Sequence, residues 1–509
     1  MTMKVLKSIY KVIGCTVLAA SLSSCVNDWL DVTPSDGADA DAALTNSSDL
    51  SAARTGMYKA LKGTSSMVDY YGQQFFVYGD VHAGDDYQYN NIGGSNRASF
   101  YYDMNYQTAS EFNTSTVSWQ SPYVVIGRAN RIIEAAESGR LTDVAENGAT
   151  IEQYGAEALV LRALAHFDLV RIFGKPYTKD QGASLGVPLV TTVLEFGAKP
   201  ARSTVKEVYD QVVKDLTTAI NSGKLATETE PGYVSVWGAK AILSRVYLNM
   251  GDYANALATA EDVINNSGAA LWTRDQYFKA WDAGTPNESE FLFRLNVSGS
   301  TDNNDLNGIG NLQGRGGYKE MVATKSFVDM LSADANDVRN DMFLPATAAK
   351  EVETFGTNKV YLNKLRGQGG NLRNVTIIPI IRLSEVYLTA AECAFRTNNK
   401  AKAVEYLNEL VKNRTTTTSA LATESDITLD RILIERRKEL IGEGQRYFDA
   451  LRCNQRIVRY TSEADKGWHK TLSKEAQSFD CDYFKAIAAI PQSEINANPE
   501  IKQNDGYGQ

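Results

Sequence analysis

Two stretches of this 509-residue chain place small and aromatic residues at the same helical spacing. In the first stretch, residues 235–266, these positions are Leu243, Ser244, Tyr247, Gly251, Tyr253, Ala256 and Ala260. The register recurs 147 residues later, within 378–414, at Ala391, Ala394, Ala403, Leu407 and Leu410. Small side chains at such positions let two paired helices approach closely, as in tetratricopeptide-type hairpins. The spacing therefore predicts a mainly all-α fold, in which helical hairpins form a scaffold with long loop insertions and a few short strands.

Further helices are predicted on both sides of these hairpins, because apolar residues recur there at intervals of three and four. The predicted ranges are 48–62, 119–137, 152–173, 427–441 and 445–456. Another helix runs to about Asn221 and is capped by Ser203-Thr204, with Glu207 near its start. Gly174 and two prolines predict an irregular segment over 175–201.

The first 25 residues have the pattern of an export signal. Lys4, Lys7 and Lys11 precede an apolar run of eleven residues, Val12 to Leu22. A permanent membrane span needs about 20 apolar residues, so the run fits a cleaved signal over residues 1–24. Leu22-Ser-Ser-Cys25 resembles the lipobox of bacterial lipoproteins, which implies that Cys25 is acylated. We expect attachment to a membrane through this lipid anchor only. The alternative is a secreted protein whose signal happens to contain Cys25.

Loss of residues 1–24 would leave 485 residues and move the formal net charge from −9 to −12, because three lysines and no acids are removed. A mildly acidic chain without a basic stripe argues against nucleic acid as a partner. Three cysteines would remain besides Cys25, an odd number without metal-ligand spacing: Cys393, Cys453 and Cys481. Export would permit a disulfide among them, but nothing in the sequence requires one.

Residues 25–47 are predicted to be a lipidated tether, because they are poor in apolar residues and rich in Asp, Ala, Ser and Thr. Trp29 and Leu30 are its candidate docking points. Three aspartates in the tether lack the glycine and the closing glutamate of an EF-hand loop, so we read them as solvated rather than as a calcium site: Asp36, Asp39 and Asp41.

Residues 70–106 form the most aromatic part of the chain. Eight of the 26 tyrosines lie in this range, interleaved with aspartates, asparagines and the Gly93-Gly94 pair. Clusters of Gly and Asn indicate loops. Aromatic rings beside carboxylates and amides suit a carbohydrate, because a ring stacks on the C–H face of a sugar and the polar groups bond its hydroxyls. The alternative is that the rings pack the loop onto the helices, and we expect roughly half of them in the core.

A second candidate ligand region is the long insertion 268–376, which is rich in glycine and carries further aromatic residues. Long irregular insertions on a rigid scaffold are usually functional. Taken together, the two regions supply the candidate ligand contacts: Asp86, Tyr87, Tyr89, Asn91, Tyr101, Trp272 and Trp281.

No sequence pattern identifies a catalytic or metal site. Gly182-Ala-Ser-Leu-Gly186 matches the GxSxG elbow, but that motif needs a strand before the serine and a helix after it, whereas here it follows a predicted helix. The histidines His82, His166 and His469 lack metal-ligand spacing. We expect no enzyme, no metal and no cofactor. The alternative is a surface glycoside hydrolase or other hydrolase that uses Asp85/Asp86 or Ser184, although a glycosidase needs two carboxyls across a cleft.

Five segments, in this order, resemble the SusD/RagB family of outer-membrane glycan-binding lipoproteins. They are CVNDWLDVTP (25–34), EALVLRALAHFDLVRIFG (157–174), IRLSEVYLTAAE (381–392), ERRKELIGEGQRYFDALR (435–452) and IPQSEINANP (490–499). Their order carries the resemblance and extends it over the whole mature chain. We accordingly expect an N-terminal SusD-like region over 48–230 and a C-terminal SusD/RagB-like region over 231–509.

The resemblance implies four tetratricopeptide-like helix pairs whose loops form the ligand face. It also implies a SusC-like TonB-dependent transporter as partner, over which such proteins sit as a lid on the extracellular face of the outer membrane. The expected function is therefore capture of an oligosaccharide or polysaccharide and delivery to that transporter. A peptide ligand, or a scaffold that binds only the transporter, remains an alternative. Charged residues of the motifs are expected to be paired and structural: Arg162, Asp168, Arg171, Glu435, Arg436, Arg446 and Asp449.

Overall fold

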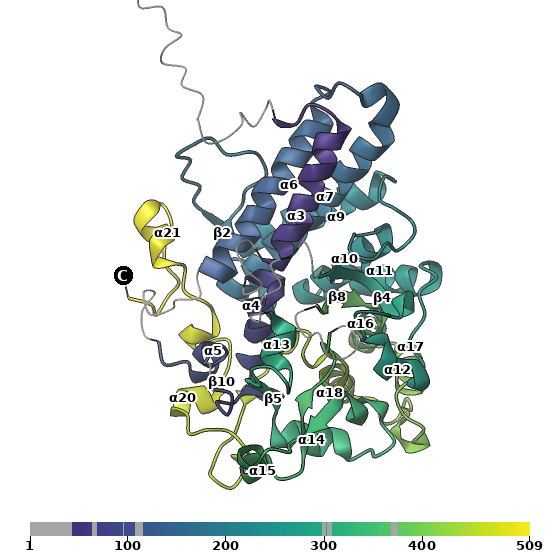
Figure 1. Cartoon of the computed structure of the whole chain (residues 1–509), viewed down its shortest axis with the longest axis vertical. Coiled ribbons are helices and arrows are strands. Elements are labelled where there is room, and N and C mark those ends of the chain that lie inside the picture. The colour runs from purple at the N-terminus through teal and green to yellow at the C-terminus, as the bar shows by residue number, and fades with distance from the viewer. Residues whose placement is uncertain are drawn as a thin grey trace, which may run out of the picture.

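The structure is a computed structural model that describes residues 43–63, 69–94, 96–106, 116–297, 302, 308–367 and 375–508. The predicted signal, Cys25 and all but the end of the tether lie outside these residues. The fold is mainly α-helical and has one large hydrophobic core. In Figure 1 the long N-terminal helices stand together at one end of the molecule, and the shorter helices and strands gather at the other.

The long helices occupy most of the ranges predicted from the sequence. They are α3 (Ser47–Lys62), α6 (Ser121–Glu137), α7 (Val144–Phe173), α9 (Val205–Asn221), α10 (Val236–Met250), α11 (Tyr253–Asn266), α16 (Leu383–Arg396), α17 (Lys400–Val411) and α18 (Leu429–Leu440). The predicted capping box of α9 is confirmed, with Thr204 and Glu207 as its reciprocal partners. Helix α7 begins eight residues before its predicted start, because its first two turns are largely exposed and show no apolar period.

Short helices lie between and after the long ones. They are α4 (Gln74–Phe76), α5 (Ser99–Asp103), α8 (Tyr177–Asp180), α12 (Arg274–Ala280), α13 (Ile309–Gln313), α14 (Lys325–Ser332), α15 (Ala349–Phe355), α19 (Arg446–Arg452), α20 (Lys474–Gln477) and α21 (Gln492–Ala497).

The described strands form five two-stranded antiparallel sheets. The pairs are β1 (Tyr87–Tyr89) with β5 (Met321–Ala323), β2 (Leu185–Pro188) with β3 (Arg202–Thr204), β4 (Phe291–Asn296) with β8 (Ile377–Arg382), β6 (Phe343–Pro345) with β7 (Lys359–Leu362), and β9 (Ile457–Val458) with β10 (Ser478–Phe479). Sheet β1–β5 joins the aromatic segment 70–106 to the insertion 268–376.

The two hairpins predicted from their shared register are present, and they pack on each other. Helix α10 pairs with α11, α16 pairs with α17, and α11 lies against α16. Five of the small residues predicted at the contacts are fully buried: Ala256, Ala260, Ala391, Ala394 and Ala403. Hairpins far apart in the sequence therefore form one helical block.

The prediction that residues 70–106 form a loop is wrong, because the segment contains regular secondary structure. The segment contains the short helices α4 and α5, a π-helical turn over Val77–Val81 and strand β1. All eight of its tyrosines are buried. One close contact fixes it against the C-terminal half, because a Cβ on Gly79 would lie 2.0 Å from the carbonyl oxygen of Gly444. The aromatic residues therefore pack the segment onto the helices.

A buried ionic network joins several elements of the second half of the chain to one another. Arg382 and Arg414 are 0% exposed and both contact Glu290 and Glu439, which are also 0% exposed. Nε of Arg414 lies 3.0 Å from Oε2 of Glu439. Burial alone would raise the pKa of Glu439, but the neighbouring arginines outweigh it and hold that pKa below its usual range. The network also includes Asp337, Arg339, Lys364, Glu435 and Glu443.

The charged motif residues are paired in the structure, as predicted. The pairs are Arg162–Asp215, Arg171–Asp168, Arg436–Asp449, Arg339–Glu435 and Arg446–Asp85. Cys393, Cys453 and Cys481 are free, so no disulfide links these three.

Replacing Arg382 by methionine should strongly destabilise the fold, because Glu290 and Glu439 would stay buried with Arg414 as their one remaining shared cation. Breaking one partner of a buried ion pair costs about 3–5 kcal/mol. Urea denaturation of Arg382→Met against the parent chain measures this. The control is Lys206→Met, which removes a surface pair with Asp210 and should leave the midpoint unchanged. Equal midpoints for the two variants would contradict the role assigned to the network.

Candidate functional site

The two tryptophans predicted to contact ligand lie in the core. Trp272 and Trp281 are both 0% exposed. The guanidinium carbon of Arg382 lies 5.4 and 5.0 Å from their ring centroids, and the backbone of Trp272 bonds both Glu290 and Arg414. A ring without exposed surface offers no face to a sugar, so the prediction for these two side chains is wrong. Their rings instead cover the buried ionic network.

Four predicted contacts in the aromatic segment are also buried. Tyr87, Tyr89 and Tyr101 are at most 3% exposed, and the hydroxyl of Tyr101 shares a hydrogen bond with Ser118. The Asp86 carboxylate accepts two hydrogen bonds, of 3.0 and 2.9 Å, from Nε of Arg437. These four predictions are wrong as well, because composition alone does not separate rings packed in a core from rings on a surface.

The adjacent carboxylates Asp85 and Asp86 are held by arginines rather than directed at a cleft. Asp85 pairs with Arg446 at 2.5 Å, and Asp86 pairs with Arg437 at 2.5 Å. Burial would raise the pKa of Asp85, but Arg446 and Arg437 outweigh it and lower that pKa to about 2. A carboxyl held ionised in this way does not serve as a general acid at neutral pH.

Among the predicted contacts that the structure describes, Asn91 is exposed. It lies on a turn that packs against a second turn from the glycine-rich insertion. The backbone N–H of Asn90 donates to the carbonyl of Glu320 at 2.8 Å, and the Glu320 carboxylate accepts from the N–H of Ala98 at 2.8 Å. A Cβ on Gly93 would lie 1.7 Å from the Tyr318 carbonyl oxygen, so only glycine fits there. The two segments predicted to bear the ligand thus meet at one surface.

We call this surface the loop pair and define it by its exposed or half-buried side chains: Asn91, Asn96, Arg97, Tyr318 and Lys319. The Arg97 guanidinium lies over the Tyr318 ring, 4.6 Å from its centroid, and bonds the Tyr318 hydroxyl at 3.4 Å. Nζ of Lys319 pairs with Glu351 at 2.6 Å. The contact between Arg97 and Tyr318 spans 221 residues of sequence, so no local spacing could have revealed it.

The chemistry of the loop pair suits a hydroxyl-rich ligand. Asn91 and Asn96 bring amide groups that both donate and accept hydrogen bonds, and Arg97 brings fixed donors. Tyr318 adds an aromatic ring and a hydroxyl at the same place. The surface therefore combines a ring with polar groups on neighbouring turns, although it uses a different tyrosine from those predicted.

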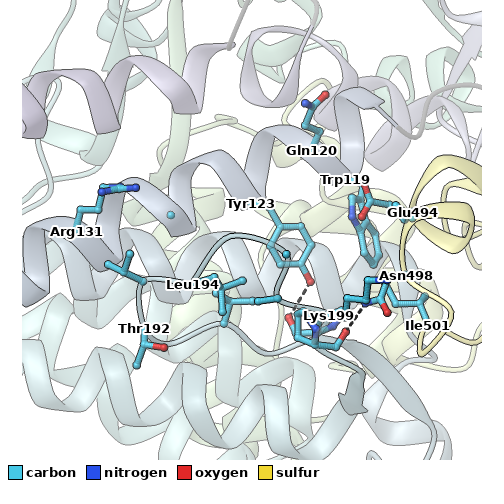
Figure 2. A pocket seen from close by; sticks show the side chains of 18 residues that line it. Trp119, Gln120, Tyr123, Arg131, Thr192, Leu194, Lys199, Glu494, Asn498 and Ile501 are labelled. Atoms are coloured by element: carbon cyan, nitrogen blue, oxygen red, sulfur yellow. Dashed lines mark hydrogen bonds between the residues drawn. The ribbon is translucent and has the colours of Figure 1, made fainter. Parts of the chain in front are cut away.

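A separate pocket of about 560 Å³ lies between α6, the segment 188–200 and α21, and Figure 2 shows its lining. Trp119 and Tyr123 form its aromatic wall, with ring centroids 5.2 Å apart. The hydroxyl of Tyr123 donates to the Pro188 carbonyl at 2.8 Å. Arg131, at one end in Figure 2, and Lys199 add positive charge. Sequence reasoning did not find this pocket, because its walls come from segments more than 300 residues apart.

Buried side chains of α6 and α7 hold the segment that borders the pocket. Nε2 of His166 accepts from the N–H of Val190 at 3.2 Å, and Nδ1 bonds the Arg162 carbonyl at 3.1 Å. Arg162 donates to the Thr191 carbonyl at 2.7 Å, and Asn130 donates to the Thr192 carbonyl at 2.8 Å. Because Nε2 of His166 accepts a hydrogen bond, the ring is neutral and carries its proton on Nδ1.

The described residues contain no group of three or more His, Cys, Asp or Glu side chains arranged to hold a metal ion. Ser184 lies between α8 and strand β2, so the strand-before, helix-after order of a nucleophile elbow is not present at this serine. No helix in the described part of the chain is both long enough and apolar enough to cross a membrane.

Two family models match successive parts of the chain. Residues 272–507 match the SusD family, and residues 28–248 match a family described as starch-binding and associating with the outer membrane. A SusD superfamily protein of Bacteroides thetaiotaomicron is 36% identical and superposes with a TM-score of 0.83, covering 90% of this chain and 100% of that one. This chain therefore belongs to the SusD family.

Two more distant relatives are named for the glycan that they bind. The starch-binding protein SusD of Bacteroides thetaiotaomicron is 33% identical over 158 residues, which are 30% of this chain and 26% of that protein. A laminarin-binding SusD-like protein is 21% identical with a TM-score of 0.68, covering 91% of this chain and 100% of that one, and shares the fold.

Replacing His166 by glutamine should reduce the dependence of stability on pH. Burial lowers the pKa of His166 to about 3, whereas the unfolded chain takes up this proton below about pH 6.5. Its contribution is therefore complete above pH 6.5 and is lost as the pH falls towards 3, by up to about 1.4 kcal/mol per pH unit. Urea denaturation of both chains at pH 8, 6 and 5 should give a shallower profile for His166→Gln. Parallel profiles would contradict the assignment.

Proposed function

We propose that this chain is a cell-surface glycan-binding protein that captures an oligosaccharide or polysaccharide at the loop pair and passes it to a SusC-like TonB-dependent transporter. In this proposal it is attached by lipid at Cys25 to the extracellular face of the outer membrane, and it performs no catalysis. Asn91, Arg97 and Tyr318 are the proposed ligand contacts.

The observation that carries the proposal is the meeting of two distant segments at an exposed surface that presents a ring and several polar side chains. Arg97 and Tyr318 are held there by each other, and the Gly93 contact keeps the two turns in register. Membership of a family whose model is described as starch-binding supports a glycan as the ligand class. The pairing of Asp85 and Asp86 with arginines supports binding without hydrolysis.

Replacing Tyr318 by alanine should weaken glycan binding, because it removes both a ring that stacks on a sugar and the partner that orients Arg97. We expect the dissociation constant to rise roughly tenfold, equal to about 1.4 kcal/mol. Isothermal calorimetry with starch, laminarin, other polysaccharides and peptides measures this and identifies the ligand class.

The matched control is Tyr154→Ala. Tyr154 is also half-buried with an arginine over its ring, Arg54 at 4.8 Å, but it lies on α7 outside the loop pair. Its loss should leave glycan affinity unchanged. Equal affinities for Tyr318→Ala, Arg97→Ala and the parent chain would refute the site. A panel silent throughout, with a TonB-dependent transporter still co-purifying, would favour a scaffold without a small ligand.

Replacing Cys25 by serine should abolish lipid attachment, because the sulfur that would carry the diacylglyceryl group is lost. Labelling cells with radioactive palmitate, followed by membrane fractionation, measures this. The matched control is Cys15→Ser, which lies within the predicted signal and should label normally. Equal labelling of the Cys25→Ser chain would exclude this cysteine as the anchor.

A further inference from the structure

The lining of the pocket beside α6 suits a stretch of extended chain that carries apolar side chains. We propose that residues 26–33 of this same chain occupy it, with Trp29 and Leu30 inside. The tether would then be docked along its first part, and Cys25 would leave the protein beside the pocket. The proposal depends on the proposed function only in taking the mature chain to begin after residue 24.

The pocket and the segment that borders it expose apolar surface. Its wall includes Val190, Ile501 and the rings of Trp119 and Tyr123. Three of the eight large apolar side chains that are exposed in the described residues lie on the bordering segment: Val193, Leu194 and Phe196. Clustered exposed apolar groups mark interaction sites. A volume of about 560 Å³ is within the range of ligand pockets and can admit large side chains.

The charges of the pocket complement those of the segment. Val26-Asn-Asp-Trp-Leu-Asp-Val-Thr33 places Asp28 and Asp31 on either side of Trp29-Leu30. Arg131 and Lys199 line the pocket, are exposed and have no ion-pair partner among the described residues. Glu494, which also lines it, lies at the far end from Arg131 in Figure 2. Lys199 lies nearer to Glu494 in Figure 2, so an acidic apolar segment fits best with a carboxylate towards Arg131.

The segment can reach the pocket. The start of α3 is fixed beside the end of α6, because the Thr45 carbonyl accepts from the N–H of Thr142 at 2.9 Å. Arg131 lies in α6 six residues before Glu137, a rise of about 9 Å, and Trp119, in the π-helical turn just before α6, lies about 27 Å from that end. The thirteen residues that separate Leu30 from Ala43 span at most about 43 Å when extended. The full length of the pocket is within this reach.

The segment also belongs to a matched family region. The N-terminal family model begins at residue 28, immediately before Trp29, and continues through α6 to residue 248. A tether of arbitrary sequence would not be part of such a match. This observation favours the chain's own segment over a separate peptide or a second copy as the occupant.

Disulfide trapping tests the proposal on residues 26–509. One chain carries Leu30→Cys with Ala198→Cys in the pocket wall, and the control carries Leu30→Cys with Ala149→Cys. Ala149 is exposed on α7, six residues beyond Asp143, which bonds Ser47. Both positions are therefore within reach of the segment. Mild oxidation and mass spectrometry of unreduced peptides give the fraction linked within one molecule and separate these products from those of the three native cysteines.

Docking predicts roughly tenfold more disulfide at Ala198 than at Ala149, and a roughly fivefold loss at Ala198 when Trp29→Ala is added. Equal yields, or no effect of Trp29→Ala, would overturn the proposal. Hydrogen exchange provides a second readout in the chain without cysteine substitutions, because Trp29→Ala should speed exchange over 190–200. Unchanged exchange there would count against docking. Neither readout involves glycan or lipid, so failure here is distinguishable from failure of the proposed function.

Discussion

The fold depends on the buried charges gathered around Glu439. Arg382 and Arg414 connect this glutamate to Glu290, so strand β8, the end of helix α17 and helix α18 are joined to the segment before β4. Taking charges out of water is expensive and is balanced only when every group finds its partners. The network therefore favours one arrangement of these elements over any in which a charge is left unpaired. Trp272 and Trp281 lie over Arg382 and keep water from it.

Helices were predictable because their signals are local. The two partners of the α9 capping box lie three residues apart, and the small residues of the two hairpins recur at helical spacing, so spacing alone identifies both. Burial of aromatic residues is not local. Nothing near Trp272 in the sequence indicates the arginines that its ring covers. The resemblance to a known family supplied the architecture but not the ligand residues, since Arg97 and Tyr318 are brought together by long-range contacts: the pairing of β1 with β5 and the hydrogen bonds beside it.

The loop pair and the pocket beside α6 differ in chemistry. The loop pair presents amides, a guanidinium and one half-buried ring, which suits a ligand rich in hydroxyls. The pocket beside α6 presents apolar walls with two cations at its margin, which suits an acidic apolar chain. Hydrogen bonds from α6 and α7 hold the bordering segment of the pocket at Val190, Thr191 and Thr192. The pocket is therefore preformed by the helical scaffold and does not depend on the loop pair.

The two bidentate pairs at Asp85 and Asp86 have a mechanical consequence. They join the segment that leads into the loop pair to helices α18 and α19, and the contact of Gly79 with Gly444 reinforces the junction. The segment that leads to the exposed turn of Asn91 is thus held against the C-terminal helices by three separate contacts. A surface that is already rigid loses little conformational entropy when a ligand binds. If the loop pair binds a glycan as proposed, its affinity should therefore depend on the contacts that it offers and little on ordering of this turn, as far as the described residues show.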